Sequence, residues 1–307
     1  MQEQVTSNLL MIRPVNFEYN QQTAESNAFQ NDENVSNSKI NNSAQECFDD
    51  LVEQLRLREI NVHVFDDLKD PFTPDSIFPN NWISMHHSGK VMLYPMEAPN
   101  RRRERRQDIL NFLKKNYDYH VLLDLSHFEE DGKFLEGTGS LVLDRINRIA
   151  YASLSSRTHP DVLKAWQQVI DYELVTFGAF DKDGIPVYHT NVVMSMGTTF
   201  CIICLEAISN PDERLAVKQK IEGTGNVLME ITMEQMSNFA GNVLLVKNKK
   251  EKQFLIMSTR AYNSLTEEQI NTMNYFAEII HSDLGYIESV GGGSARCMIA
   301  EIHLPEK

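Results

Sequence analysis

The feature that most constrains the fold of this chain is a recurring order of strands and helices. In the clearest copies, two short apolar runs of strand length precede a stretch with helical period, and a third apolar run follows it. The expected helices begin near residues 44, 101, 160, 209 and 265. This spacing of roughly 50 to 60 residues is typical of repeat architectures.

The expected elements can be given copy by copy. We predict strands at 91–94 and 119–123 around a helix at 101–116; strands at 140–143, 149–152 and 173–177 with a helix at 160–170; strands at 192–194, 200–203 and 226–230 with a helix at 212–222; and strands at 242–246, 253–257 and 285–289 with a helix at 267–281. The two ends of the chain supply the fifth copy. There a last strand at 297–303 pairs with a first strand at 9–13, and a helix at 44–57 and a strand at 61–65 complete it.

This order predicts an α/β fold in which five ββαβ units form a closed ring. The N- and C-terminal strands close the ring, and residues 1–307 make a single domain. A non-repetitive α+β fold is the alternative that the pattern leaves open. The Asn-, Gln- and Ser-rich segment 16–43 lacks apolar periodicity, so we expect a long loop there.

Composition limits the classes of partner. Of the 307 residues, 42% are hydrophobic and 23% are charged, as in a folded globular protein. The formal net charge of −14 argues against nucleic acid or an anionic membrane as a partner. No apolar run approaches the roughly 18 residues of a membrane span, and four cysteines are too few for a disulfide framework. We therefore expect a cytoplasmic protein, and the sequence leaves open whether it forms a homodimer.

A glycine-rich segment near the C-terminus could present a nucleophile. Residues 291–298 read GGGSARCM, and the glycines allow the backbone almost any conformation just before a predicted strand. Cys297 would lie at the mouth of that strand beside an arginine, where a thiolate can be exposed and stabilised. A flexible turn before an ordinary buried cysteine is the alternative.

Two further residues occupy corresponding places in other units. Glu136 stands in the Gly-rich turn FLEGTGS, and His189 stands in YHTN, each just ahead of the first strand of its unit. In a ring these places converge on one mouth, so Cys297, His189 and Glu136 could form a catalytic set. Taken one at a time, a surface turn and a structural histidine explain Glu136 and His189 equally well.

Arginines could bind a carboxylate at the same mouth. The run 101–106 reads RRRERR, and Arg157 stands in SSRTHP directly before a predicted helix. The planar fork of a guanidinium group matches a carboxylate. A solvated first helical turn is the alternative for the run, and a helix cap is the alternative for SSRTHP.

These motifs, in this order, resemble the arginine deiminase/amidinotransferase superfamily of guanidino-group-modifying enzymes. The resemblance extends over nearly the whole chain, from MIRP at 11–14 to GGGSARCM. It implies a five-bladed α/β propeller, and it implies a nucleophilic Cys297, a general acid/base His189 and a Glu136 that orients the histidine or holds the substrate. It further implies that Arg157 and Arg101, or Arg102 beside it, hold the carboxylate of an amino-acid substrate.

The departures from the family pattern concern the substrate. Family members that act on a guanidinium group hold it with acidic residues in an FxRD- or FxED-like motif and, in deiminases, two residues after the histidine. Here Phe78 begins FPNNW, which places Asn81 at the first position, and Asn191 follows His189 by two residues. Gly139 replaces the last acid of the EGGD-like motif.

The amide side chains favour a neutral substrate. A guanidinium group has only N–H donors, whereas a ureido group also carries a carbonyl acceptor, which a buried carboxylate would oppose. Asn81 and Asn191 therefore predict hydrolysis of citrulline to ornithine, ammonia and carbon dioxide through an S-carbamoyl intermediate, without metal or organic cofactor. This resembles the citrulline-utilising branch of the superfamily. The alternatives are an arginine deiminase or dihydrolase, an amidinotransferase, and a non-catalytic amino-acid binder.

Overall fold

The computed structural model describes residues 3–33 and 35–307. Within these ranges the strands form five sheets of three strands each. In every sheet the middle strand pairs antiparallel with one neighbour and parallel with the other. A parallel pair needs a crossover connection, and a helix supplies it in each unit. The repeated strand–strand–helix–strand order is therefore confirmed.

The five units use these elements. The first unit consists of β15 (Ala300–Glu301), β1 (Asn8–Arg13), α1 (Asn37–Leu57) and β2 (Asn61–Asp66), and the second of β3 (Ile83–Met85), β4 (Lys90–Leu93), α2 (Gln107–Asn116) and β5 (Val121–Asp124). The third consists of β6 (Val142–Asp144), β7 (Ile149–Ser153), α4 (Pro160–Val169) and β8 (Glu173–Phe177), and the fourth of β9 (Met194–Met196), β10 (Phe200–Ile203), α6 (Pro211–Gly223) and β11 (Val227–Glu230). The fifth consists of β12 (Leu244–Lys247), β13 (Gln253–Ser258), α8 (Thr259–Ser264), α9 (Glu267–Phe276) and β14 (Glu278–Ser282). Shorter segments are the 3-10 turns η1 (Pro79–Asn81), η2 (Arg101–Glu104), η3 (Ser126–Asp131) and η4 (Leu205–Ala207) and the helices α3 (Gly137–Ser140), α5 (Thr190–Val193), α7 (Met233–Ser237) and α10 (Gly285–Gly291).

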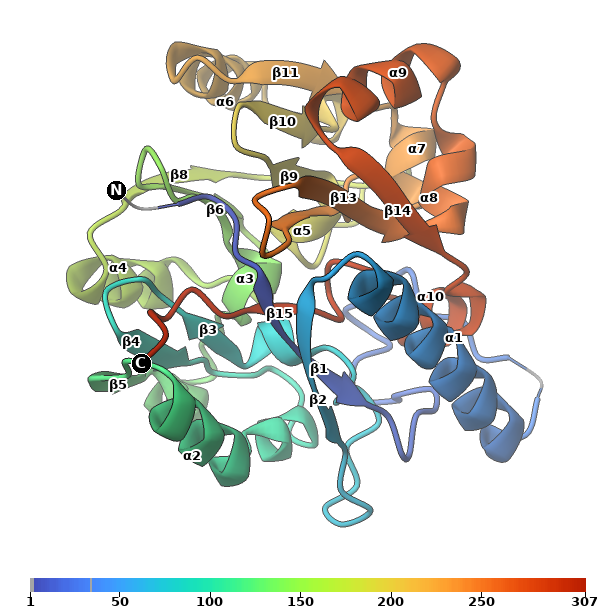
Figure 1. The fold of residues 1–307 in the computed structure, drawn as a ribbon. Coiled ribbons are helices and arrows are strands. Elements are labelled where there is room, and N and C mark those ends of the chain that lie inside the picture. The colour runs from blue at the N-terminus through green and yellow to red at the C-terminus, as the bar shows by residue number, and fades with distance from the viewer. Residues whose placement is uncertain (1–2, 34) are drawn as a thin grey trace.

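The sheets spread around the middle of the molecule, with the long helices on the outside (Figure 1). The short antiparallel edge strands lie innermost, where β9 contacts β6 and β12, and β15 contacts β3. The outer helices pack apolar residues on the sheets, and α1 lies against β14 of the neighbouring unit as well as against β1 and β2 of its own. In the third unit, for example, Leu163 and Trp166 of α4 pack in one buried cluster with Ala150 and Ala152 of β7. The layering buries one stripe of each helix and leaves the middle to the inner strands.

The helix starts follow from local sequence. The Asn210 side chain accepts hydrogen bonds from the backbone N–H groups of the first turn of α6, and Pro211 occupies its first position. A reciprocal capping box between Thr266 and Gln269 begins α9. Each such cap contributes about 1 kcal/mol to helix stability.

The two ends of the chain meet in one sheet. Leu9 and Leu10 of β1 stand opposite Glu301 and Ala300 of β15 in an antiparallel pair, and β1 pairs parallel with β2 along its whole length. The predicted pairing of the terminal segments is confirmed, but β15 is shorter than the expected strand 297–303. Cys297 precedes it in an irregular segment.

Two expected strands are helical in the structure. The segment predicted as a strand at 192–194 is mostly α5, and β9 begins only at Met194. The strand expected at 285–289 is α10, in which Ile287 and Val290 are buried on one side at helical spacing. The real third strand of that unit is β14, which takes the end of the helix expected at 267–281. Short apolar runs do not by themselves distinguish a strand from a buried helical turn.

Other boundaries differ as well. The helix expected at 101–116 is divided into η2 and α2, with Arg105 and Arg106 between them. The loop expected at 16–43 ends earlier, because α1 begins at Asn37; residue 34 of that loop lies outside the described residues. In the described part of the chain, no helix is both long and apolar enough to cross a membrane.

Candidate active site

Each unit contributes a polar side chain from the segment that leads into its innermost strand. Cys297 precedes β15, Asn81 ends η1 before β3, Glu136 precedes α3 and β6, His189 precedes α5 and β9, and Asn242 precedes β12. All five are buried, with exposed fractions of 3% or less. Because the inner strands lie together in the middle of the molecule, these segments meet there, as the repeat pattern predicted for Cys297, His189 and Glu136.

His189 and Glu136 form the shortest ionisable contact of the site. The His189 Nε2 atom lies 2.8 Å from Glu136 Oε2. Burial lowers the pKa of His189 to about 4, although the hydrogen bond to Glu136 opposes this shift. Burial would raise the pKa of Glu136, but Arg157, His189 and Arg101 together lower it below the usual range. The pair therefore holds a neutral imidazole against an ionised carboxylate at neutral pH.

Two glycines make room for this contact. A side chain on Gly139 would place its Cβ 2.5 Å from Asn81 Nδ2 and 2.8 Å from His189 Nδ1. Gly137 has a positive φ of 47°, and a Cβ there would collide with the backbone oxygen of Asn80. The departure from the family's EGGD-like motif at Gly139 thus has a steric cause, since Asn81 and His189 occupy the space.

The thiol of Cys297 lies between two asparagines. Its Sγ atom is 3.3 Å from Asn242 Nδ2 and 3.5 Å from Asn191 Nδ2. The sulfur is thus in contact with the amide groups of two asparagines. The sequence led us to expect an exposed cysteine at a strand mouth, which is wrong: Cys297 is 3% exposed and lies before the strand.

Arg101 is held by carboxylates from within the protein. Its Nε and Nη2 atoms lie 2.9 and 3.1 Å from the two oxygens of Glu104, and its Nη1 donates to Asn81 Oδ1 at 3.0 Å. Asp75 and Glu136 each lie 3.6 Å from the same guanidinium group. Burial would lower the pKa of Arg101, but these carboxylates raise it.

Arg157 lies on the other side of Glu136, at 3.5 Å. Its Nε is 3.2 Å from Glu97 Oε2, and its Nη2 donates to Ser26 Oγ at 2.8 Å and to the backbone oxygen of Thr23 at 3.2 Å. The guanidinium group also lies over the ring of Tyr188, 5.1 Å from its centroid. The predicted loop 16–43 thus reaches the site and occupies the donors of Arg157.

The site contains more carboxylates than guanidinium groups. Four carboxylates pair with two arginines: Asp75, Glu97, Glu104 and Glu136 with Arg101 and Arg157. Burial raises the pKa of Glu104 to about 8 and also raises that of Asp75, in each case against the charge of Arg101. The Oδ1 atom of Asp75 is buried without a hydrogen-bond partner among the described residues. Two arginines therefore do not fully balance four acidic groups, and Asp75 leaves an unused acceptor.

These side chains surround a small cavity. Its walls include Asp75, Asn81, Arg101, Arg157, Tyr188, His189 and Cys297, together with Asn27, Phe78 and the glycines 291–293. The Phe78 ring packs on Gly291 and Gly293, where any side chain would come within about 2.9 Å of it. The open space, about 10 Å³, holds about one water.

The predicted site residues come together around this cavity. Glu136 and Asn191 do not line it, but they contact His189 and Cys297, which do. The sequence analysis missed Asp75, Glu104 and Asn242. Asn242 could have been found, because it stands in the fifth unit where His189 and Glu136 stand in theirs. The burial of Asp75 and Glu104 depends on contacts between units and leaves no local signal in the sequence.

The sequence also matches a known family. Residues 13–304 match the family model described as N,N dimethylarginine dimethylhydrolase, eukaryotic. The chain belongs to this family. The resemblance to guanidino-group-modifying enzymes that the motifs indicated is therefore confirmed. No curated protein matches the sequence.

Solved structures show the same fold. One of them is the N-terminal domain of ArgZ, a cyanobacterial arginine dihydrolase, as a cysteine-to-serine variant bound to substrate. It matches this chain with a TM-score of 0.75 at 17% identity, over 97% of this chain and 98% of that domain. A cysteine-to-alanine variant of AgrE in complex with L-arginine has the same TM-score and identity, over 98% of this chain but only 40% of AgrE. A dimethylarginine dimethylaminohydrolase adduct with S-methyl-L-thiocitrulline has a TM-score of 0.65 at 13% identity, over 98% of this chain and 100% of that one.

Proposed function

We propose that the protein is a cysteine-dependent hydrolase of a guanidino amino acid and that it converts arginine to ornithine, two ammonia molecules and carbon dioxide. The observation that carries this proposal is the excess of buried carboxylates beside Cys297 and His189, with a free oxygen on Asp75. A bound cation would lower the raised pKa values of Glu104 and Asp75 and stabilise their ionised forms, which a neutral ligand cannot do. Arginine carries one more positive charge than citrulline.

The asparagines suit the second half of this reaction. The first hydrolysis turns the guanidinium group into a neutral ureido group, whose carbonyl needs an N–H donor. Asn191 and Asn242 direct amides at Cys297 Sγ, where the reacting carbon would lie. Acidic groups for the substrate and amides for the ureido intermediate together support a dihydrolase. A structural relative, ArgZ, is described as an arginine dihydrolase.

The chemistry needs only side chains of this site and water. His189, neutral at the start, takes the proton of the Cys297 thiol as the sulfur adds to the guanidinium carbon, and it gives this proton to the ammonia that leaves. Water, deprotonated by His189, then adds to the same carbon and expels the thiolate, which yields the ureido compound. A second round of the same steps releases the second ammonia and leaves a carbamate, which breaks down to ornithine and carbon dioxide.

The remaining roles are assigned by position. Glu136 orients His189 and stabilises its protonated form during the reaction. Arg157 binds the substrate's α-carboxylate when its contacts with Ser26 and Thr23 are exchanged for it. Arg101, which Glu104 holds rigidly, adds positive charge at the same place, and Phe78 forms the wall.

We also propose that the five units form one closed propeller domain over 1–307, which the β1–β15 pairing supports.

A second candidate is hydrolysis of citrulline alone, which the amides at Asn81 and Asn191 favour. The two functions differ in their first substrate. We expect the purified protein to release ornithine and two equivalents of ammonia from arginine, with a kcat/KM above that for citrulline. Turnover of citrulline without turnover of arginine would refute the dihydrolase proposal and support the second candidate.

Two variants connect the activity to the site. Cys297→Ser should abolish product formation from every substrate, and Cys201→Ser, at a buried cysteine of β10 outside the site, should retain it.

Dimethylarginine should be tested in the same assay because of the family to which the chain belongs. Release of dimethylamine as the main product would replace arginine as the substrate but keep the mechanism.

A further inference from the structure

The turn that carries Cys297 follows a segment with little conformational preference of its own. Residues 291–293 are glycines, which allow the backbone many conformations. On its other side the turn leads into β15, where Glu301 lies opposite Leu9 of β1. Within the turn, the Cys297 N–H donates to the backbone oxygen of Ser294 at 2.9 Å. The position of the sulfur therefore depends on the side chains that hold the turn to the paired strand.

The Arg296 side chain bridges this turn. Its Nη1 donates to the backbone oxygen of Ile299 at 3.0 Å, and its Nη2 donates to Glu301 Oε2 at 2.9 Å. The side chains of Arg296 and Glu301 are only 9% and 8% exposed. A hydrogen bond between two charged groups is roughly twice as strong as a neutral one. The guanidinium group thus ties the residue before Cys297 to a strand that the sheet already holds.

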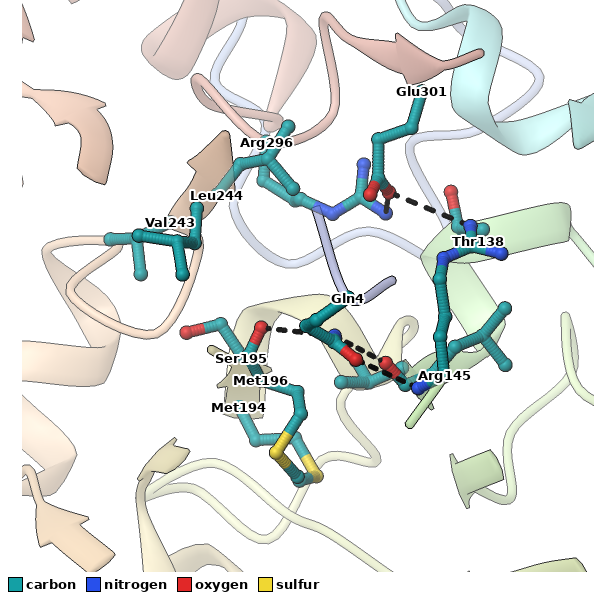
Figure 2. A pocket seen from close by; sticks show the side chains of 13 residues that line it. Gln4, Thr138, Arg145, Met194, Ser195, Met196, Val243, Leu244, Arg296 and Glu301 are labelled. Atoms are coloured by element: carbon teal, nitrogen blue, oxygen red, sulfur yellow. Dashed lines mark hydrogen bonds and ion pairs between the residues drawn. The ribbon is translucent and has the colours of Figure 1, made fainter. Parts of the chain in front are cut away.

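This ion pair lies in a second cavity, separate from the one that Cys297 lines. Residues of β6, β9 and β12 form its walls, and Arg145 and Arg296 both turn toward Glu301 there (Figure 2). Arg145 Nη2 lies 4.0 Å from Glu301 Oε2, and His303 Nε2 lies 3.1 Å from Oε1. Burial would raise the pKa of Glu301, but Arg296, Arg145 and His303 together lower it. The carboxylate is therefore ionised at neutral pH and can hold Arg296.

The backbone of Arg296 also orients Asn242. The Arg296 N–H donates to Asn242 Oδ1 at 3.1 Å, which leaves Nδ2 of the same amide facing Cys297 Sγ at 3.3 Å and the backbone oxygen of Asn191 at 2.9 Å. Asn191 follows His189 by two residues. A shift of Arg296 would therefore move the sulfur and also disturb the contact that connects it to the segment of His189.

We propose that Arg296 is a positioning residue, which Glu301 holds in place so that Cys297 Sγ stays in register with His189. It acts through Cys297 rather than on the substrate. A buried ion pair is a weak source of stability, because the cost of desolvation offsets the attraction, whereas a sulfur misplaced by 1 Å can slow a reaction about 100-fold. The inference rests on the role of Cys297 as nucleophile in the proposed function and is independent of which substrate is used.

Arg296→Lys tests the proposal. A lysine keeps the positive charge but lacks the planar fork that contacts two acceptors at once. We expect kcat to fall about 10- to 100-fold while KM stays within about twofold, because the substrate-binding residues are unchanged. A merely structural role would lower the melting temperature without this separation of kcat from KM. A kcat within about twofold of that of the unaltered protein would overturn the proposal.

Arg260→Lys is the matched control. Arg260 makes the same kind of double contact on the surface of the fifth unit, to Asn238 Oδ1 at 3.0 Å and to the backbone oxygen of Ser237 at 3.2 Å. Its kcat should equal that of the unaltered protein, and an equal loss in both variants would refute a specific role of Arg296. Glu301→Gln, which removes the charge that holds Arg296, should lower kcat in the same direction as Arg296→Lys.

The assay uses whichever of arginine, citrulline and dimethylarginine the unaltered protein hydrolyses fastest. A failure of the proposed function then appears in the unaltered protein, whereas a failure of the present inference appears only in the variants. Crystal structures of the unaltered protein and of Arg296→Lys give a readout without turnover. We expect Cys297 Sγ to lose its contacts with the amides of Asn191 and Asn242 in the variant, and a sulfur in the same position in both structures would overturn the proposal.

Discussion

The tight packing at Gly139 yields the most specific prediction from this structure. An alanine at this position would bring its Cβ to 2.5 Å from Asn81 Nδ2 and 2.8 Å from the imidazole of His189. Neither neighbour can easily move. Asn81 is held by Arg101 Nη1 at 3.0 Å, and His189 is held by Glu136 at 2.8 Å.

The expected cost has two parts. Overpacking a tightly filled interior typically destabilises by about 1–3 kcal/mol, so the free energy of unfolding of Gly139→Ala should fall by about 2 kcal/mol. Displacing His189 by a fraction of an ångström also misplaces the proton it transfers. A 1 Å error of this kind can lower the rate about 100-fold. Urea denaturation and steady-state kinetics with arginine measure the two effects separately.

A matched glycine provides the control. Gly223 ends α6, and a Cβ there meets nothing within 4 Å. Gly223→Ala should therefore leave kcat unchanged and keep or slightly raise stability. If Gly139→Ala behaved like Gly223→Ala in both assays, Asn81 and His189 would not be fixed where the structure places them. Adding Asn81→Ala to Gly139→Ala should recover part of the lost stability, because it removes the closest contact.

Three further outcomes are expected. Glu136→Gln should lower kcat by about 10²- to 10⁴-fold, measured by ammonia release, because an amide cannot stabilise a protonated His189; activity within threefold of the unaltered protein would contradict the assigned role. Stability should fall as the pH drops from about 6.5 to 4: His189 and His303 keep a folded pKa of about 4, so the unfolded chain binds protons first. Each histidine contributes about 3 kcal/mol to this loss, and together they outweigh Glu104, whose folded pKa of about 8 opposes it; a flat urea midpoint over that range would refute the assignment. Asn242→Ala should reduce kcat/KM, because it removes an amide that contacts Cys297 Sγ at 3.3 Å, whereas Asn238→Ala on the same unit's surface should leave kcat/KM unchanged.

The repeat made most of the fold predictable. Apolar runs such as those of β8 and β10 were predicted with the bounds that the structure has, because a buried strand carries its signal in consecutive residues. The helical turns α5 and α10 were not predicted, since their few apolar residues read equally well as strands. The terminal pairing of β1 and β15 was predicted because the other four units required a partner for each end.

The meeting of Glu136, His189 and Cys297 in one place was predictable for the same reason. Glu136 and His189 stand at equivalent points of two units, and Cys297 follows a glycine run whose backbone freedom is visible in sequence. Asp75 and Glu104 were missed because their importance comes from what surrounds them: each is buried against Arg101, and nothing in the local sequence distinguishes them from surface acids. Their discovery also changed the favoured substrate. The asparagines alone favoured a neutral ureido group, whereas the charge of the whole site favours a cation.

The position of the site in the repeat explains how the charge of the site can vary while the fold is kept. The buried apolar clusters extend across neighbouring units, and the segments that lead into the inner strands place apolar residues such as Phe78, Val192 and Val243 in them. The polar residues of the same segments contact the site instead, so a change from Asp to Asn at such a position alters the charge of the site but removes no apolar contact from a core. Charge that is buried there must still be balanced, and the raised pKa values of Glu104 and Asp75 mean that two arginines do not balance four carboxylates. Under the proposed function, this shortage of positive charge is the property by which the site would select a guanidino substrate.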